Sequence, residues 1–77
     1  MMKYEIDTEE SVSHGVTIAV SKLENIAISD LPELITAIDP DALDTIFVDR
    51  TNACVSFAYS NSIVKVYNGE YLTVNAA

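Results

Sequence analysis

The sequence is poor in the residues on which several common classes of protein depend. A single cysteine, Cys54, excludes an internal disulfide and a zinc site with four cysteine ligands. The glycines, Gly15 and Gly69, stand alone, so no glycine-rich loop can hold a phosphate group. No apolar run reaches the roughly 18 residues that cross a bilayer, and residues 1–10 lack the apolar segment of a signal peptide. We therefore expect a cytoplasmic protein that makes no contact with a membrane.

Positive charge is also scarce in this chain. Four basic side chains face twelve acidic ones, which gives a net charge of −8. Such an excess repels a phosphate backbone instead of replacing its counterions. The composition therefore predicts no direct binding to nucleic acid. It is typical of a protein that stays soluble in concentrated salt, and it fits an acidic protein from an ordinary habitat equally well.

The chain is short but apolar enough to fold. Its 77 residues are 49% hydrophobic, which is ordinary for a globular protein. A single core of this size rarely yields more than about 3–5 kcal/mol of net stability. The pattern runs without a linker or a repeat, so we predict one domain over residues 1–77 and expect self-association to help it.

The N-terminal third predicts a strand followed by a long helix. Residues 2–6 alternate apolar and polar side chains, as in a strand with one buried face. Asp7 and Glu10 have the spacing of a capping box, which predicts a helix from near Thr8 to about Glu24. An apolar stripe at helical spacing predicts the side that faces the core; it consists of Val12, Val16, Ala19, Val20 and Leu23.

Two prolines predict two short helices in the next segment. Ser29 or Asp30 can cap a turn in which Pro32 is near the first helical position. Asp39 followed by Pro40 repeats this arrangement. We therefore expect two short helices joined by a corner.

The C-terminal third alternates like three strands, and the alternation predicts their register. Phe57 lies opposite Val64 if a two-residue loop, 60–61, joins the first two strands. A two-residue loop at Asn68-Gly69 would place Lys65 in the core. We therefore predict a three-residue loop, 67–69, with Gly69 in a left-handed conformation.

Together these elements predict an α+β fold. It comprises an N-terminal strand, one long helix, two short helices and a three-stranded antiparallel meander, with the long helix packed on one sheet face. The face predicted to meet the helix carries Val55, Phe57, Val64, Val66, Leu72 and Val74. Whether the N-terminal strand joins beside the first or the last strand of the meander is left open by the sequence.

The second face of the sheet is the candidate site. It carries Ile63, Lys65, Tyr67, Tyr71 and Thr73. Aromatic residues are enriched at the centres of interfaces, so these residues form a candidate protein-interaction surface. Two alternatives are that paired tyrosines only stabilise a solvated sheet, and that a helix covers this face.

No constellation in the sequence indicates catalysis, a metal or a cofactor. His14 lies off the apolar stripe, as a solvated surface histidine does. Asp39, Asp41 and Asp44 lack the glycine and glutamate of a calcium-binding EF-hand loop. Cys54 has no base beside it in the sequence, and we expect a half-buried thiol. We therefore expect a protein that is not an enzyme and has neither catalytic nor cofactor-binding nor metal-binding residues.

Four segments of the chain together have a distinctive pattern. They are the helix over 12–23, Leu31 to Leu34, the strand Val55-Ser56-Phe57 and above all Ile38-Asp39-Pro40-Asp41-Ala42-Leu43-Asp44. Through these segments, residues 4–75 resemble the halobacterial output domain, type 1. The resemblance implies a small acidic domain of salt-loving archaea that acts in signalling without an assigned enzymatic activity. It carries over no catalytic or binding residue.

Two functions follow as hypotheses. The first is an interaction or output module of signal transduction that binds another protein or its own copy, as a homodimer, through the sheet. The second is a sensor that holds a small apolar effector between helix and sheet, which would need a cavity there.

Overall fold

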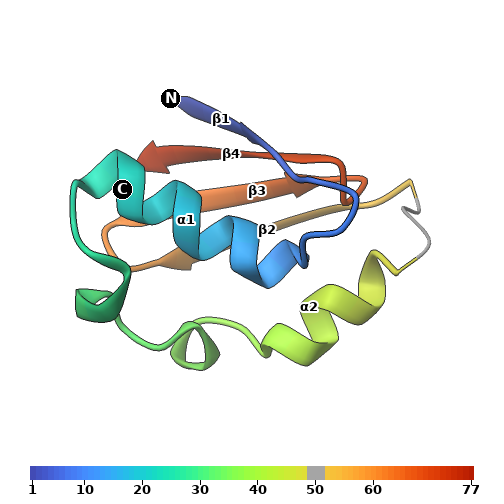
Figure 1. The fold of residues 1–77 in the computed structure, drawn as a ribbon, viewed down its shortest axis with the longest axis horizontal. Coiled ribbons are helices and arrows are strands. Elements are labelled where there is room, and N and C mark those ends of the chain that lie inside the picture. The colour runs from blue at the N-terminus through green and yellow to red at the C-terminus, as the bar shows by residue number, and fades with distance from the viewer. Residues whose placement is uncertain (49–51) are drawn as a thin grey trace.

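A computed structural model describes residues 1–48 and 52–77 of the chain. The strands are β1 (Met2–Glu5), β2 (Cys54–Tyr59), β3 (Ser62–Tyr67) and β4 (Tyr71–Ala76). The α-helices are α1 (Val12–Glu24) and α2 (Pro40–Ile46), and the short 3-10 turns η1 (Ile28–Asp30) and η2 (Leu34–Thr36) lie between them. This is the predicted α+β fold (Figure 1).

The strands form one antiparallel sheet in the order β1-β4-β3-β2. The structure therefore resolves the alternative that the sequence left open, because β1 joins beside the last strand. Both helices lie on the same side of the sheet, and α1 runs along it (Figure 1). Strands β1 and β2 are the two edges.

The core lies between α1 and the sheet, as the periodicity predicts. Val16, Ala19 and Val20 of α1 are fully buried. Three valines and one leucine of the sheet are fully buried too, namely Val64, Val66, Leu72 and Val74. Lys65, between Val64 and Val66, is exposed. Val55 and Phe57 are only partly buried against this core, since β2 is an edge strand.

The predicted register is confirmed between β2 and β3, whereas between β3 and β4 the predicted faces are confirmed but the pairing is shifted by two residues, with Val64 opposite Val74. Phe57 pairs with Val64, and the two-residue loop 60–61 joins β2 to β3. The second loop has the predicted three residues but lies one residue later, at 68–70, because Tyr67 pairs with Tyr71 and stays in the ladder. Gly69 has the predicted left-handed conformation, with a φ of 69°.

The predicted start of the long helix is wrong. The Glu10 carboxylate does accept the N–H of Asp7, as in a capping box, but the Asp7 side chain accepts the N–H of Glu9 and the Asp7 carbonyl oxygen accepts that of Glu10. These bonds close an isolated turn before the helix. The helix itself begins at Val12, where the Ser11 side chain accepts the backbone N–H of His14. Its predicted end is confirmed, with a left-handed Asn25 after Glu24.

The short helix predicted near Pro32 is present only as the two 3-10 turns η1 and η2. Pro32 lies between η1 and η2, and its carbonyl oxygen accepts the hydroxyl of Tyr59 at 2.5 Å. This contact and the burial of Leu34 draw the segment towards the core in two tight turns. The second short helix is confirmed as α2, with Pro40 in its first turn. In the described part of the chain, no helix has the length and apolarity needed to span a membrane.

Candidate functional site

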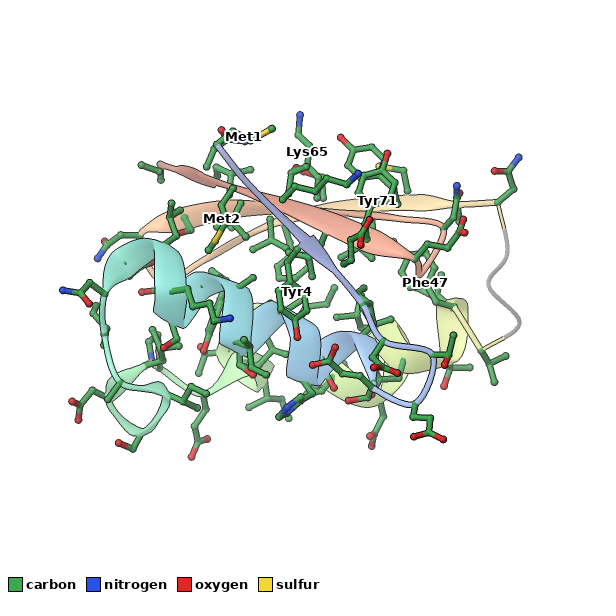
Figure 2. The ribbon with its side chains drawn as sticks, turned by 45° about the horizontal axis from the view of Figure 1, so that its top comes forward. Met1, Met2, Tyr4, Phe47, Lys65 and Tyr71 are labelled. Atoms are coloured by element: carbon green, nitrogen blue, oxygen red, sulfur yellow. The ribbon has the colours of Figure 1, made fainter. Side chains whose placement is uncertain are left out.

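The register places all five predicted interaction residues on the sheet surface opposite the helices, which we call the outer face. Tyr67 pairs with Tyr71 and Lys65 pairs with Thr73, while Ile63 lies two residues from Lys65 on β3. Figure 2 shows Lys65 and Tyr71 pointing away from the helices, and Tyr4 and Phe47 lying between sheet and helices. Among the described residues, no helix covers the outer face, so the alternative of a second core is wrong.

An aromatic pair forms the centre of this face. The rings of Tyr67 and Tyr71 are stacked, with centroids 5.0 Å apart and planes inclined by 18°. The ammonium group of Lys3 lies 4.5 Å from the centre of the Tyr71 ring, a cation–π contact. Both rings are partly exposed, so they offer apolar area together with two hydroxyl groups.

Lys3 also belongs to the outer face, although it is not among the five predicted interaction residues. The alternation over residues 2–6 placed it away from the core, but its neighbours depended on where β1 joins the sheet. Lys3 pairs with Thr73, and Thr73 pairs with Lys65 on its other side. Thr73 is only 9% exposed between these neighbours, and the row Lys3, Thr73 and Lys65 therefore crosses three strands.

The titratable side chains near β1 have a structural role. The hydroxyl of Tyr4 donates to the carboxylate of Glu10 at 2.7 Å, and His14 Nε2 lies 3.7 Å from the same carboxylate. This bond, burial and the negative charge of Glu10 raise the pKa of Tyr4 to about 12. The His14 side chain is 59% exposed, as expected for a surface histidine, and the contacts tie β1 to the turn before α1.

A second carboxylate joins α1 to the first turn of the meander. Glu24 accepts hydrogen bonds from Ser60 Oγ at 2.8 Å, from the Asn61 N–H at 3.1 Å and from Ser62 Oγ at 2.6 Å. Burial raises the pKa of the Glu24 carboxyl, but these bonds outweigh it and hold the pKa below its ordinary value of 4.5. The cluster fixes the end of α1 against the sheet.

Two of the three aspartates at positions 39, 41 and 44 cap the N-termini of helices. Asp39 accepts the N–H groups of Asp41 at 3.0 Å and of Ala42 at 3.3 Å, and so caps α2. Asp44 accepts both the N–H and the hydroxyl of Ser13 at 2.9 Å each, and so caps α1 from another element. In the part of the chain that the structure describes, no three His, Cys, Asp or Glu side chains gather as metal ligands.

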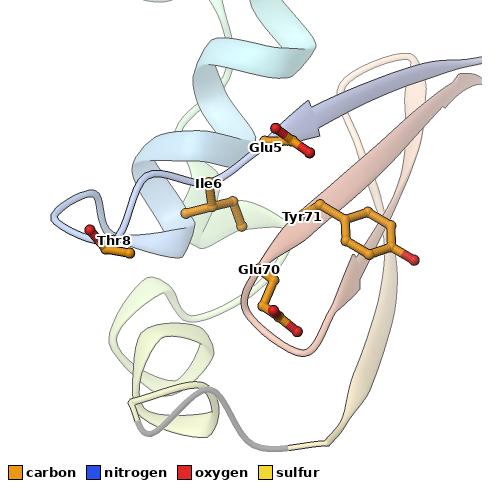
Figure 3. Close-up of a pocket in the computed structure, with 5 residues that line it drawn as sticks. All are labelled: Glu5, Ile6, Thr8, Glu70 and Tyr71. Carbon is orange, nitrogen blue, oxygen red and sulfur yellow. The ribbon is translucent and has the colours of Figure 1, made fainter.

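Two further features adjoin the outer face. Cys54 is a free thiol on the edge strand β2, where it pairs with Tyr67. It is exposed instead of half-buried, because no described helix covers this face. A surface hollow of about 410 Å³ lies where the chain leaving β1 meets the turn before β4 (Figure 3). Its lining consists of Glu5, Ile6, Thr8, Glu70 and Tyr71.

This hollow is not the cavity that the small-effector hypothesis needs. That cavity would lie between α1 and the sheet near Phe57. The side chains of Val16, Val20, Val64 and Val66 fill the space between these elements and are fully buried. The structure therefore gives the effector hypothesis no support.

Comparison with known proteins identifies one similarity. The sequence profile described as Halobacterial output domain 1 matches residues 8–76, which include both helices, the 3-10 turns and the whole meander. No curated protein and no solved structure matches the chain.

Proposed function

Because the chain belongs to the Halobacterial output domain 1 family, we propose that it is a protein-interaction module of haloarchaeal signal transduction that works without catalysis. We place it in the cytoplasm, where it binds another protein or a second copy of itself through the sheet. The observation that carries this proposal is the outer face, which holds a stacked tyrosine pair on a surface left open by the described helices.

A second copy is the simplest partner. The edge strand β2 has the sequence Cys-Val-Ser-Phe-Ala-Tyr and carries no charged side chain, whereas the opposite edge, β1, carries Lys3 and Glu5. Charged residues on an edge strand oppose pairing with another chain, so β2 is the less protected edge. Pairing of two β2 strands would extend the sheet and the outer face across a twofold axis.

Light scattering in concentrated salt tests this proposal, because salt screens the repulsion between two copies that each carry a charge of −8. Replacing Tyr67 and Tyr71 by serine removes the apolar centre of the outer face and is expected to weaken association. Ile35→Ser is the matched control, because Ile35 is 64% exposed on η2, on the helical side. A strict monomer at high concentration would remove the dimer, and association unchanged by the tyrosine variants would place the contact elsewhere.

A further inference from the structure

Charged side chains are distributed unevenly between the two sides of the sheet. Of the three lysines, Lys3 and Lys65 lie on the outer face, in strands that flank β4. Both side chains are exposed. Of the twelve acidic residues, only Glu5 has an outer-face position among the described parts of the strands, and Asp49 lies outside the described residues.

The other carboxylates lie in the turns and on the helical side. They are Asp7, Glu9, Glu10, Glu24, Asp30, Glu33, Asp39, Asp41, Asp44 and Glu70. A chain with a net charge of −8 therefore has one sheet surface on which lysines outnumber acidic residues. Such a separation makes the outer face less negative than the rest of the molecule.

We propose that the outer face binds an acidic segment of a partner protein. Lys3 and Lys65 pair with carboxylates of that segment, and the Tyr67–Tyr71 pair packs against its backbone and side-chain stems. This inference rests on the proposed function and adds the chemistry of the partner. The occupant follows from charge complementarity, because positive side chains are concentrated here and carboxylates are excluded from all but one position.

The arrangement of the two lysines suits this task. Lys3 is held over the Tyr71 ring at 4.5 Å, so part of its conformational freedom is already lost before binding. Lys65 lies two strands away, at a Cα separation of roughly 10 Å given the usual spacing of neighbouring strands.

A nucleic acid carries the same sign of charge but fits the surroundings less well. Glu5 is on the outer face, and Glu70 lies in the turn next to Tyr71. A phosphate backbone that extends beyond the two lysines would meet these carboxylates at the end of β1 and the start of β4. An acidic peptide segment can carry its few charges only where the two lysines lie, and so it need not approach Glu5 or Glu70.

The experiment measures binding of fluorescent peptides to the folded chain by anisotropy. The probes are a peptide of alternating glutamate and serine, its glutamine counterpart and a short DNA duplex, each at the lowest salt in which circular dichroism shows the chain folded. The double variant Lys3→Glu/Lys65→Glu reverses the charge of the outer face. The matched control is Lys22→Glu, because Lys22 is an exposed lysine of α1 on the helical side.

We expect the glutamate peptide to bind better than the glutamine peptide and the duplex, and to bind less tightly as salt rises. The double variant should weaken its binding about tenfold, and the control by less than about twofold. Equal binding of the glutamine peptide, tighter binding of DNA, equal loss in Lys22→Glu or no binding of the glutamate peptide would each overturn the acidic-partner proposal. The outer-face contact in the proposed function fails separately, when the Tyr67 and Tyr71 variants leave association in light scattering unchanged.

Discussion

The carboxylate of Asp44 is expected to be a principal link between α2 and the rest of the protein. It accepts the N–H and the hydroxyl of Ser13 at 2.9 Å each, across 31 residues of sequence. Each of the two bonds in this partly buried site contributes about 0.5–1 kcal/mol, and a negative charge at the start of α1 adds about 0.3–1 kcal/mol. Asp44→Ala should therefore lower the free energy of unfolding by about 2 kcal/mol.

This loss is large for a domain whose core supplies about 3–5 kcal/mol. It corresponds to a fall in Tm of roughly 8–16 °C, measured by circular dichroism. Asp44→Asn keeps an acceptor for the Ser13 N–H and should lose about half as much. Asp41→Ala is the control, because it removes the same charge from an exposed position of the same helix.

A double-mutant cycle isolates the hydroxyl bond. Ser13→Ala removes the hydroxyl and leaves the backbone N–H in place, so its coupling to Asp44→Ala should be about 1 kcal/mol. If Asp44→Ala costs no more than Asp41→Ala, or if the coupling is zero, this carboxylate does not hold α2 against α1.

Three other predictions concern single side chains. Stability should fall as the pH drops below 4.5, because the folded state holds the pKa of Glu24 below that value whereas the Glu24 carboxyl of the unfolded chain is protonated near it. Glu24→Gln should therefore flatten this part of the pH profile of Tm. Leu43→Ala should cost about 2–5 kcal/mol and unfold much of the population, as seen by circular dichroism, because Leu43 is fully buried. Tyr4 should ionise with a pKa of about 12 in an ultraviolet absorbance titration, and Glu10→Gln should return its pKa towards 10.0. Unchanged profiles in the Glu24 and Glu10 variants, or a fully folded Leu43 variant, would contradict these contacts.

The meander could be predicted in detail because its rules are local. Period-two alternation sets which side chains share a face, and the parity of each loop then sets the register. Lys65 decided the second loop, because only an odd number of residues kept it out of the core. The same alternation predicted which residues form the outer face, including Tyr67, which lies two residues from Lys65 on β3.

The helix boundaries could not be predicted in the same way. Asp7 and Glu10 satisfy the capping-box pattern whether they start a helix or close a single turn, and the hydroxyl of Tyr4 on Glu10 helps to hold the turn. Pro32 fits a helix start, but its carbonyl oxygen is bound by Tyr59 from the meander. These deciding partners lie on other elements, so no local pattern contains them.

The place of Lys3 illustrates the limit for the candidate site. Alternation put it on the side away from the core, yet only the order of the strands brings it beside Thr73 and over Tyr71. The sequence allowed the N-terminal strand to join either edge of the meander. Beside β2, Lys3 would have contacted neither Thr73 nor Tyr71.

Fluorine NMR of the chain labelled with fluorotyrosine tests most directly whether the outer face is the contact surface. The four tyrosines divide evenly, since Tyr67 and Tyr71 lie on the outer face while Tyr4 and Tyr59 pack on the helical side. The labelled chain would be titrated with the glutamate peptide and, separately, with the unlabelled chain. We predict that the resonances of Tyr67 and Tyr71 shift and those of the other two stay in place. Shifts confined to Tyr4 and Tyr59, or no shift in either titration, would contradict the account.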